Sequence, residues 1–252
     1  MQNSKLIIAN WKMNLTAGEA KAWLSEFSGL PLTSSASVVI CPAFTTLAQI
    51  FTLVPEHVAL GAQNCYFQPK GAYTGEIAIN MLQELKVQYI LLGHSERRAL
   101  FGEDDQLIKQ KLEAVLNTSS INPVLCVGES LAQRENNKWQ EHIYAQLKVA
   151  LAVNTETANL KRVIVAYEPI WAIGSGKSAT LQEITEVHQF IRKAVAELKP
   201  EIKQLRVLYG GSVKAANSAE LLASSEIDGL LVGGASLKPS EFNAIINNLK
   251  HD

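Results

Sequence analysis

Eight short apolar runs alternate with longer helix-like segments, and this alternation constrains the fold more than any other feature of the sequence. The runs lie at residues 6–9, 38–41, 58–60, 89–92, 124–127, 163–167, 205–209 and 229–232. Segments between them, such as 19–27, 103–116, 138–153, 181–198 and 240–249, repeat apolar residues at spacings of three and four, which is typical of amphipathic helices. Runs rich in Ile, Val and Leu between such helices predict parallel strands buried on both faces.

Eight such units in 252 residues favour an α/β fold, a closed (β/α)8 barrel of eight parallel strands that forms one domain over residues 1–252. An open, doubly wound sheet is the alternative, but that fold calls for GxGxxG after the first strand and this chain has NWKMN there. The composition, 47% hydrophobic and 19% charged, is that of a chain that buries a large core.

Charge, cysteines and the N-terminus exclude several classes of protein. With 23 Lys+Arg against 24 Asp+Glu and no block of like charge, no nucleic-acid partner and no membrane surface is expected. Cys41, Cys65 and Cys126 show no CxxC or CxxH spacing, so we expect no metal site and a reducing compartment. The N-terminal apolar run is too short for a signal sequence or a membrane span, which predicts a cytoplasmic protein.

Glu168 is the first candidate catalytic residue, because it directly follows a buried run. A carboxylate at a strand end is often only a solvated loop residue, but in a barrel the strand ends gather at the face that carries the active site. Pro169 fixes one end of the next segment, glycines loosen the other, and the middle is apolar, which predicts a lid over a general base. The predicted lid comprises Pro169, Ile170, Trp171, Ala172, Ile173, Gly174, Ser175, Gly176 and Lys177. The tail GSGKS is no P-loop, since Trp171 stands where that motif needs glycine.

His94 and Lys12 follow two other strands. A lone histidine is often structural, but Ser95 and Glu96 are expected to form the cap and first turn of a short helix. The positive end of that helix dipole disfavours the imidazolium, so we expect a neutral imidazole that donates a hydrogen bond. Lys12, next to Asn10, would place a positive charge at the barrel mouth for an anionic substrate, although a solvated surface lysine is the alternative.

Glycine-rich loops after the last two runs predict a phosphate site. Gly210-Gly211-Ser212 follows run 205–209, and Gly233-Gly234-Ala235-Ser236 follows run 229–232. Either glycine pair alone would be interpreted as a tight turn. Both together, at the two strands where barrels often bind phosphate through backbone N–H groups, favour a phosphate clamp.

The segments ANWKMN, GAQNCYFQPKGAYTGE, GHSERR, AYEPIWAIGSGK, YGGSV and LLVGGASL occur in this order, and together they resemble the triosephosphate isomerase family from the first strand to the eighth. The resemblance implies interconversion of dihydroxyacetone phosphate and D-glyceraldehyde 3-phosphate in glycolysis and gluconeogenesis, through an enediolate and without a metal or an organic cofactor. The family is itself a familiar example of a glutamate base paired with a neutral histidine.

The resemblance also implies a role for each matching residue. Glu168 matches the base, His94 the electrophile, Lys12 and Asn10 the groups that stabilise charge on the substrate oxygens, and Glu96 a supporting carboxylate. The phosphate clamp corresponds to the backbone N–H groups of Gly174, Ser212, Gly233 and Gly234.

The loop 61–76 bears on assembly, since a long loop without a helix of its own is unusual in a compact domain. The resemblance implies that the loop, around Thr74, inserts beside the active site of a second subunit, so a homodimer is expected. A floppy surface loop is the alternative, but it would expose the apolar side chains of Tyr66, Phe67 and Tyr73.

Two other functions stay open at this point. A non-catalytic sugar-phosphate-binding barrel would keep the glycine loops but could dispense with Glu168, His94 and Lys12. An isomerase of a larger sugar phosphate predicts a roomier pocket. Activity on three-carbon and five-carbon phosphates separates these alternatives.

Overall fold

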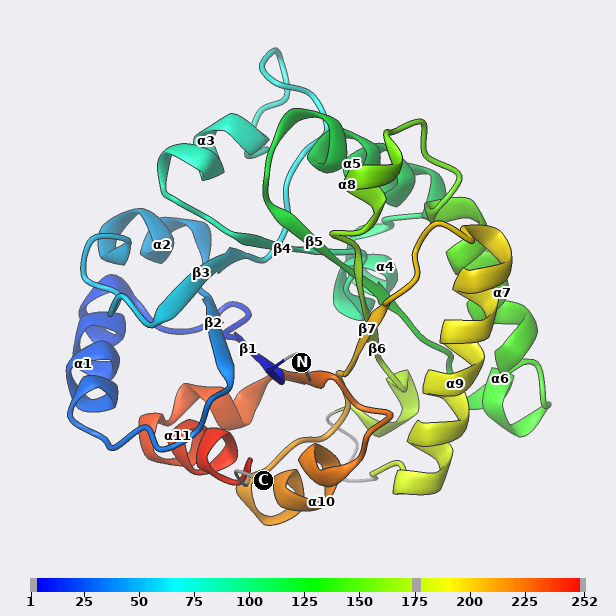
Figure 1. Ribbon diagram of the computed structural model, residues 1–252. Coiled ribbons are helices and arrows are strands. Elements are labelled where there is room, and N and C mark those ends of the chain that lie inside the picture. Colours follow the sequence, from blue (N-terminus) through cyan, green and yellow to red (C-terminus); the bar gives the residue numbers. More distant parts are fainter. Residues whose placement is uncertain (1–3, 174–177, 250–252) are drawn as a thin grey trace.

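The computed structural model describes residues 4–173 and 178–249. Parallel strands β1 to β8 pair in chain order, and β8 pairs with β1, so the described strands form a closed barrel inside a ring of helices (Figure 1). The strands are β1 Leu6–Asn10, β2 Ser37–Cys41, β3 Val58–Ala62, β4 Tyr89–Leu92, β5 Asn122–Val127, β6 Ile164–Tyr167, β7 Arg206–Tyr209 and β8 Gly229–Val232. The helices are α1 Ala17–Ser28, α2 Phe44–Ile50, α3 Ile79–Glu84, α4 Ser95–Phe101, α5 Asp105–Thr118, α6 Leu131–Glu135, α7 Trp139–Ala150, α8 Thr157–Leu160, α9 Leu181–Leu198, α10 Ala215–Ala223 and α11 Pro239–Asn247, with 3-10 turns η1 Ile170–Ala172 and η2 Gly234–Leu237.

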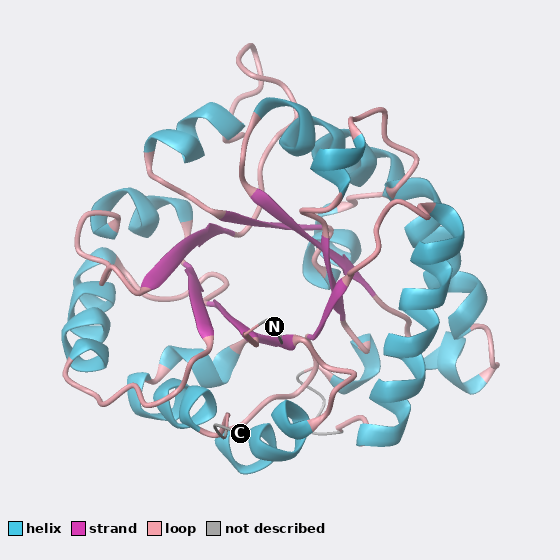
Figure 2. Cartoon of the chain, viewed as in Figure 1, coloured by secondary structure: helices cyan, strands magenta, loops and turns pink. Residues whose placement is uncertain are grey.

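The strands are apolar except at their ends, because both of their faces are buried. In β1, Leu6 and Ile8 belong to a cluster made only of strand residues inside the barrel. Ile7 and Ala9 belong to the larger cluster that also contains residues of the surrounding helices. Each buried aliphatic side chain contributes roughly 1.5–3 kcal/mol, so the two layers together, with helices enclosing the strands (Figure 2), drive closure of the barrel.

The strand prediction is confirmed, with small shifts at the ends. Runs 89–92 and 229–232 coincide with β4 and β8. β3 continues beyond its predicted end to Ala62, and β5 starts earlier, at Asn122. The alternative of an open sheet is wrong, because Leu6 to Ala9 of β1 pair with Gly229 to Val232 of β8.

The five predicted helical segments correspond to α1, α5, α7, α9 and α11, and their ends follow local capping chemistry. The Thr16 side chain accepts from the Glu19 N–H while the Glu19 side chain accepts from the Thr16 N–H, and Thr180 and Glu183 repeat this capping box at α9. An N-cap of this kind contributes about 1 kcal/mol. The segment 181–198 therefore has the predicted boundaries.

The loop between β3 and α3 projects beyond the ring of helices, in cyan in Figure 1. It packs on itself: the Tyr66 N–H donates to the Ile77 carbonyl at 2.8 Å, and the Tyr66 ring lies 4.4 Å from that of Phe67 and 4.8 Å from that of Tyr73, between centroids. Thr74 is exposed in this loop. The loop is therefore a defined surface feature and not a floppy connection.

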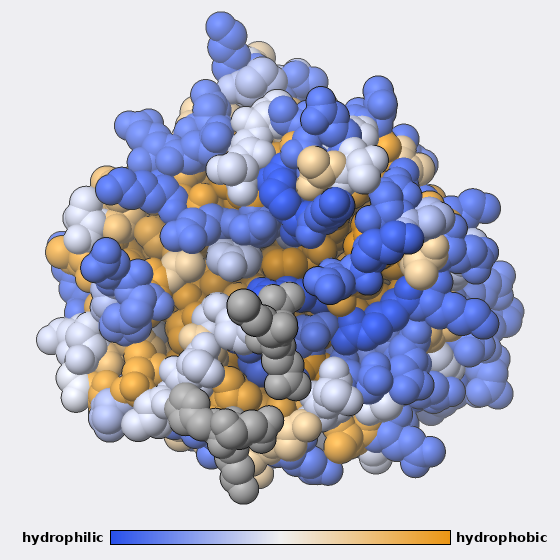
Figure 3. All heavy atoms as spheres, in the orientation of Figure 1, coloured by the Kyte–Doolittle hydropathy of each residue, from blue (hydrophilic) through white to orange (hydrophobic). Residues whose placement is uncertain are grey.

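The visible surface is largely hydrophilic (Figure 3), and the three cysteines are buried. Hydrophilic residues cover most of the periphery of the face shown in Figure 3, with hydrophobic residues between them. Over residues 4–173 and 178–249, no helix has the length and apolar character that crossing a membrane requires. Cys41, Cys65 and Cys126 are free and buried, and burial raises the pKa of Cys65 to about 12, so its thiol stays protonated and unreactive.

Candidate active site

Asn10 and Lys12 stand where β1 ends and the chain turns toward the barrel mouth. Asn10 is buried, and its Oδ1 accepts a hydrogen bond from the Lys12 N–H at 3.0 Å. Lys12 has φ 53°, in the left-handed region, which costs a non-glycine residue roughly 1–2 kcal/mol. Gln63 holds this turn by donating to the Lys12 carbonyl at 2.8 Å. Strained backbone of this kind is often retained at functional sites.

His94 caps helix α4, so the predicted cap at Ser95 is wrong by one residue. The His94 Nδ1 accepts from the Glu96 N–H at 3.3 Å, and Ser95 is the first residue of the helix. Because that N–H can only donate, Nδ1 carries no proton and the ring proton lies on Nε2. The local sequence thus fixes both the orientation and the tautomer of the imidazole.

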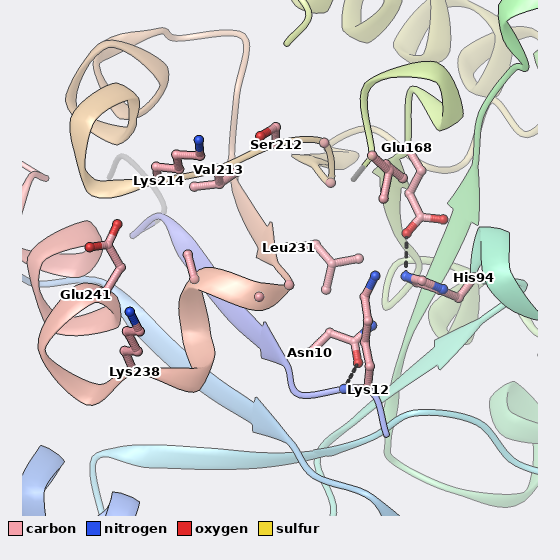
Figure 4. Close-up of a pocket in the computed structure, with 16 residues that line it drawn as sticks. Asn10, Lys12, His94, Glu168, Ser212, Val213, Lys214, Leu231, Lys238 and Glu241 are labelled. Atoms are coloured by element: carbon pink, nitrogen blue, oxygen red, sulfur yellow. Dashed lines mark hydrogen bonds and ion pairs between the residues drawn. The ribbon is translucent and has the colours of Figure 1, made fainter. Parts of the chain in front are cut away.

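Glu168 follows β6 and faces His94 across the mouth of the barrel (Figure 4). Its Oε1 lies 2.9 Å from His94 Nε2, and its Oε2 accepts from the Ser95 N–H at 2.8 Å. Only 1% of the Glu168 side chain is exposed. The sequence predicted that Glu168 and His94 belong to one site. In the structure the two side chains also contact each other directly.

The contact with Glu168 decides the electrostatics of His94. Burial lowers the pKa of the imidazole, while the charge and the hydrogen bond of the Glu168 carboxylate raise it. The combined effect of Glu168 is the larger, so the pKa lies above its usual value. The predicted depression is therefore wrong for this arrangement, because a carboxylate at hydrogen-bonding distance outweighs both burial and the helix dipole.

Lys12 forms an ion pair with Glu96 at the mouth of the barrel. Its Nζ lies 2.6 Å from Glu96 Oε1, with 27% of the lysine and 42% of the glutamate side chain exposed. Glu96 Oε2 also lies 3.7 Å from His94 Nδ1. Glu96 therefore orients the lysine at the rim of the cavity and contributes no wall to it.

The predicted side chains surround one cavity of about 450 Å³, within the size range of small-molecule sites. It is lined by Asn10, Lys12, His94, Glu168, Ile173, Gly210, Gly211, Ser212, Val213, Lys214, Leu231, Gly233, Gly234, Ala235, Lys238 and Glu241. Figure 4 shows Glu168, His94 and Lys12 at one end and Lys214, Lys238 and Glu241 at the other. Most of these lining residues are ones that the sequence predicted for the site.

Both glycine loops line the cavity, and they adjoin the candidate catalytic residues. A Cβ added at Gly210 would make tight contacts, 3.1 Å from Glu168 Cγ and 3.2 Å from the Tyr167 carbonyl oxygen, and a Cβ added at Gly233 would lie 3.4 Å from Lys12 Cε. Gly233 precedes the turn η2, and its carbonyl accepts from both the N–H and the hydroxyl of Ser236, at 2.8 and 2.7 Å. The turn is thus held rigidly beside the cavity.

The first residues of the predicted lid have a restricted backbone, as expected. Pro169 has φ −65°, and Ile170–Ala172 form the 3-10 turn η1. The Trp171 indole N–H donates to Glu129 Oε1 at 2.8 Å, and Ile173 reaches the cavity. Gly174, Ser175, Gly176 and Lys177 lie outside the described residues.

Glu129, Lys214 and Lys238 were not foreseen. Glu129 is fully buried and binds the lid residue Trp171. It carried a signal close to that of Glu168, a carboxylate separated by one residue from the end of an apolar run. Lys214 and Lys238 line the outer end of the cavity. Each follows one of the glycine loops, and that position is the only sequence signal they carry.

Gly128, between β5 and Glu129, is packed against the backbone of the candidate base. A Cβ there would lie 1.8 Å from the Glu168 carbonyl oxygen. We expect Gly128→Ala to destabilise the fold by about 1–3 kcal/mol or more, since the two backbones must separate, and to misplace Glu168. Urea unfolding measures this against Gly18→Ala, where a Cβ meets nothing within 4 Å. Equal stability of the two variants would contradict the expectation.

The arrangement suits one kind of chemistry. A carboxylate can take a proton from carbon beside a carbonyl group only when the developing oxyanion meets donors already in place, and His94 Nε2 and Lys12 Nζ face the same cavity. Within residues 4–173 and 178–249, no group of three or more His, Cys, Asp or Glu side chains could hold a metal ion.

Comparison with known proteins agrees with this geometry. A sequence model of the family described as triosephosphate isomerase matches residues 5–249. A triosephosphate isomerase of Thermoanaerobacter sp. (strain X514) is 44% identical over 245 residues, which cover 96% of this chain and 98% of the relative. One of Francisella tularensis subsp. mediasiatica (strain FSC147) is 43% identical over 245 residues, 96% of both chains. The chain therefore belongs to the triosephosphate isomerase family.

Proposed function

We propose that the protein is a triosephosphate isomerase, which interconverts dihydroxyacetone phosphate and D-glyceraldehyde 3-phosphate in glycolysis and gluconeogenesis. The observation that carries this proposal is the meeting of Glu168, His94 and Lys12 in one cavity (Figure 4) that is also lined by the two glycine loops. The first three supply proton-transfer chemistry, and the glycine loops suit a phosphate.

Glu168 is the proposed base. In this structure its carboxylate is bound by the Ser95 N–H and faces His94, so it must turn into the cavity when substrate arrives. There it removes a proton from C1 of dihydroxyacetone phosphate, leaving an enediolate, and returns a proton to C2. The same carboxylate thus serves both carbons, and neither a hydride acceptor nor a cofactor is required.

His94 is the proposed electrophile. When Glu168 turns away, the carboxylate that raises the pKa of the imidazole is removed, while the Glu96 N–H still occupies Nδ1. The neutral ring then presents its Nε2–H to the two substrate oxygens, and it can pass a proton between them. Lys12 stabilises the charge that develops on these oxygens, with Asn10 fixing its backbone and Glu96 its ammonium group.

The phosphate group is proposed to bind at the backbone N–H groups of Ser212, Gly233 and Gly234, together with that of Gly174. Lys214 and Lys238 line the same cavity and add positive charge to it. The lid, residues 169–177, closes over the bound substrate. Closure excludes water and prevents the enediolate from losing phosphate before the second proton transfer.

A homodimer is proposed because several large apolar side chains are exposed. Met13 is 94% exposed, Leu100 73% and Phe101 67%. These residues, with Tyr73 and Thr74, lie on segments that follow β1, β3 and β4. Large apolar side chains that are exposed in this way are typical of a subunit interface, and a second copy of the chain would cover them.

We expect Met13→Asp to split the dimer, because the charge would replace an exposed apolar side chain of the proposed interface. Light scattering should then give a mass near 27.5 kDa where the unmodified protein gives twice that value. Activity should fall as well, since Met13 adjoins Lys12. Leu53→Asp is the control, since Leu53 is 51% exposed but precedes β3 at the other end of the barrel. A fully active monomer of the unmodified chain would overturn the dimer proposal.

We propose further that residues 1–252 form one domain and that the protein is cytoplasmic, with no nucleic-acid or membrane partner and no cofactor. The continuous match to the family over residues 5–249 supports the first point.

The substrate is tested by assaying three-carbon and five-carbon ketose and aldose phosphates side by side. We expect turnover of the triose phosphates alone, because the lid residue Ile173 already bounds the cavity of about 450 Å³. Turnover of a pentose phosphate would favour an isomerase of larger sugars. Binding of triose phosphate without turnover would favour the non-catalytic barrel.

A further inference from the structure

The turn between β5 and α6 holds the start of the lid at three points. Oε1 of Glu129 accepts from the Tyr167 hydroxyl at 3.0 Å and from the Trp171 indole at 2.8 Å. The Glu129 carbonyl accepts from the Ile170 N–H at 3.1 Å. Any movement of this turn therefore displaces residues on both sides of Glu168, including the start of the lid.

Two glutamine side chains fix the turn on either side of Glu129. The Gly128 N–H donates to Gln146 Oε1 at 2.9 Å, and the Ser130 N–H donates to Gln133 Oε1 at 2.8 Å. Gln133 belongs to α6 and Gln146 to α7. Because both amide oxygens are engaged by backbone donors, both amide nitrogens are left to face a common neighbour.

That neighbour is His142, on α7. Its Nδ1 lies 2.9 Å from Gln133 Nε2, and its Nε2 lies 3.1 Å from Gln146 Nε2. An amide nitrogen only donates and a neutral imidazole accepts at one nitrogen only, so the ring accepts either from Gln133 at Nδ1 or from Gln146 at Nε2, but not from both. We assign the shorter contact, at Nδ1, as the hydrogen bond and place the ring proton on Nε2.

Arg134 gives α6 a second contact with the lid. Its guanidinium lies 5.1 Å from the Trp139 ring centroid and 5.9 Å from that of Trp171. The placement of α6 therefore affects Trp171 both through Glu129 and through Arg134. Gln133 lies in the same short helix, one residue before Arg134.

We propose that His142 is a positioning residue for the lid, which in its neutral form accepts a hydrogen bond from Gln133 and so fixes the turn that carries Glu129. This inference deepens the proposed isomerase function and rests on it. If Nδ1 were protonated, its N–H would face the amide N–H of Gln133, and the two donors would repel. The Gln133 amide would then have to rotate, and its oxygen would release the Ser130 N–H.

The surroundings of His142 favour the neutral ring. Burial lowers the pKa of the imidazole most, Asp105 on α5 raises it, Arg98 on α4 lowers it, and a hydrogen bond to the Gly128 backbone raises it, with a net shift below the usual value. The neutral form therefore prevails at and above pH 6.5. The hydrogen bond from Gln133 to His142 Nδ1 is lost as the pH falls below that value through the lowered pKa.

The test uses two variants of the full chain. His142→Leu removes the acceptor, and we expect it to lower kcat/KM about 3- to 10-fold at neutral pH, as for the loss of one hydrogen bond. His142→Asn keeps an oxygen near the position of Nδ1 but does not titrate, so it should stay within about twofold of the unmodified protein. The ratio of kcat/KM for the unmodified protein to that for His142→Asn should fall between pH 7.5 and about 5, since acid effects shared by both proteins cancel.

A second measurement reports the lid directly, without substrate. The protein is labelled with 5-fluorotryptophan, and the resonance of Trp171 is assigned by its loss in Trp171→Phe. We expect this resonance to shift with acid in the unmodified protein and to be displaced in His142→Leu at neutral pH, with neither change in His142→Asn. If the protein is not an isomerase, activity is absent throughout while the fluorine signal still tests the positioning role.

Either of two results would overturn the inference. One is normal kcat/KM and an unchanged Trp171 resonance in His142→Leu. The other is a His142→Asn variant whose activity and fluorine signal follow the same acid dependence as the unmodified protein. Should His142→Leu fail to fold, the pH comparison with His142→Asn decides alone.

Discussion

Glu168→Gln is expected to lower kcat by roughly 10²- to 10⁴-fold, the usual contribution of a positioned general base. Glutamine has nearly the shape of glutamate but cannot accept the proton, and its amide can still contact the Ser95 N–H through its oxygen. KM should change little, because the phosphate group and its clamp are untouched. Steady-state kinetics in both directions measure the effect, and both directions should lose the same factor since one carboxylate serves both carbons.

Glu168→Asp separates position from chemistry. The shorter side chain keeps a base but withdraws it by about 1 Å, and a displacement of that size can cost roughly 10²-fold. We therefore expect the aspartate variant to lie between the unmodified protein and Glu168→Gln. A glutamine variant that retains kcat within tenfold would mean that another group takes the proton.

Lys12→Met should have the second largest effect. The ammonium group faces the cavity and is held by Glu96 at 2.6 Å, so it acts on the oxyanion without reorganising. Removing a preorganised donor of this kind costs roughly 10²- to 10³-fold in kcat, and KM should rise as well because the substrate is an anion. Kinetics at two ionic strengths measure both losses.

Glu96→Gln provides the matched control for Lys12. It leaves the ammonium group in place and removes only the charge that orients it, so its loss in kcat/KM should be smaller than that of Lys12→Met. The Glu96 N–H that binds His94 Nδ1 belongs to the backbone and is retained. If Lys12→Met and Glu96→Gln were both fully active, the oxyanion would have to be stabilised by His94 alone.

The fold was predictable because its strands are buried on both faces. Leu6 and Ile8 line the barrel while Ile7 and Ala9 face the helices, so no polar residue interrupts the run. The ends of β3 and β5 were not predictable, because Ala62 and Asn122 join the sheet by pairing with neighbours distant in the chain. Register depends on tertiary contacts that local pattern does not contain.

The site was predictable to the extent that its residues directly follow strands. Asn10, Lys12, His94 and Glu168 were found in this way, and all four line the cavity. The contacts between these residues were not predictable, since Glu168 and His94 lie 74 positions apart in the chain. Their pairing also reverses the expected shift of the His94 pKa. The left-handed backbone of Lys12 also has no signal in the sequence, because lysine has no preference for it.

The most direct test of the central claim follows the hydrogen atoms. Dihydroxyacetone phosphate is incubated with the purified protein in D₂O with a metal chelator and no added cofactor, and proton NMR follows substrate and product. We predict D-glyceraldehyde 3-phosphate carrying deuterium at C2, as proton transfer through a solvent-exchanging carboxylate requires. Unchanged substrate, or product formed entirely without deuterium as in a hydride shift, would contradict the account.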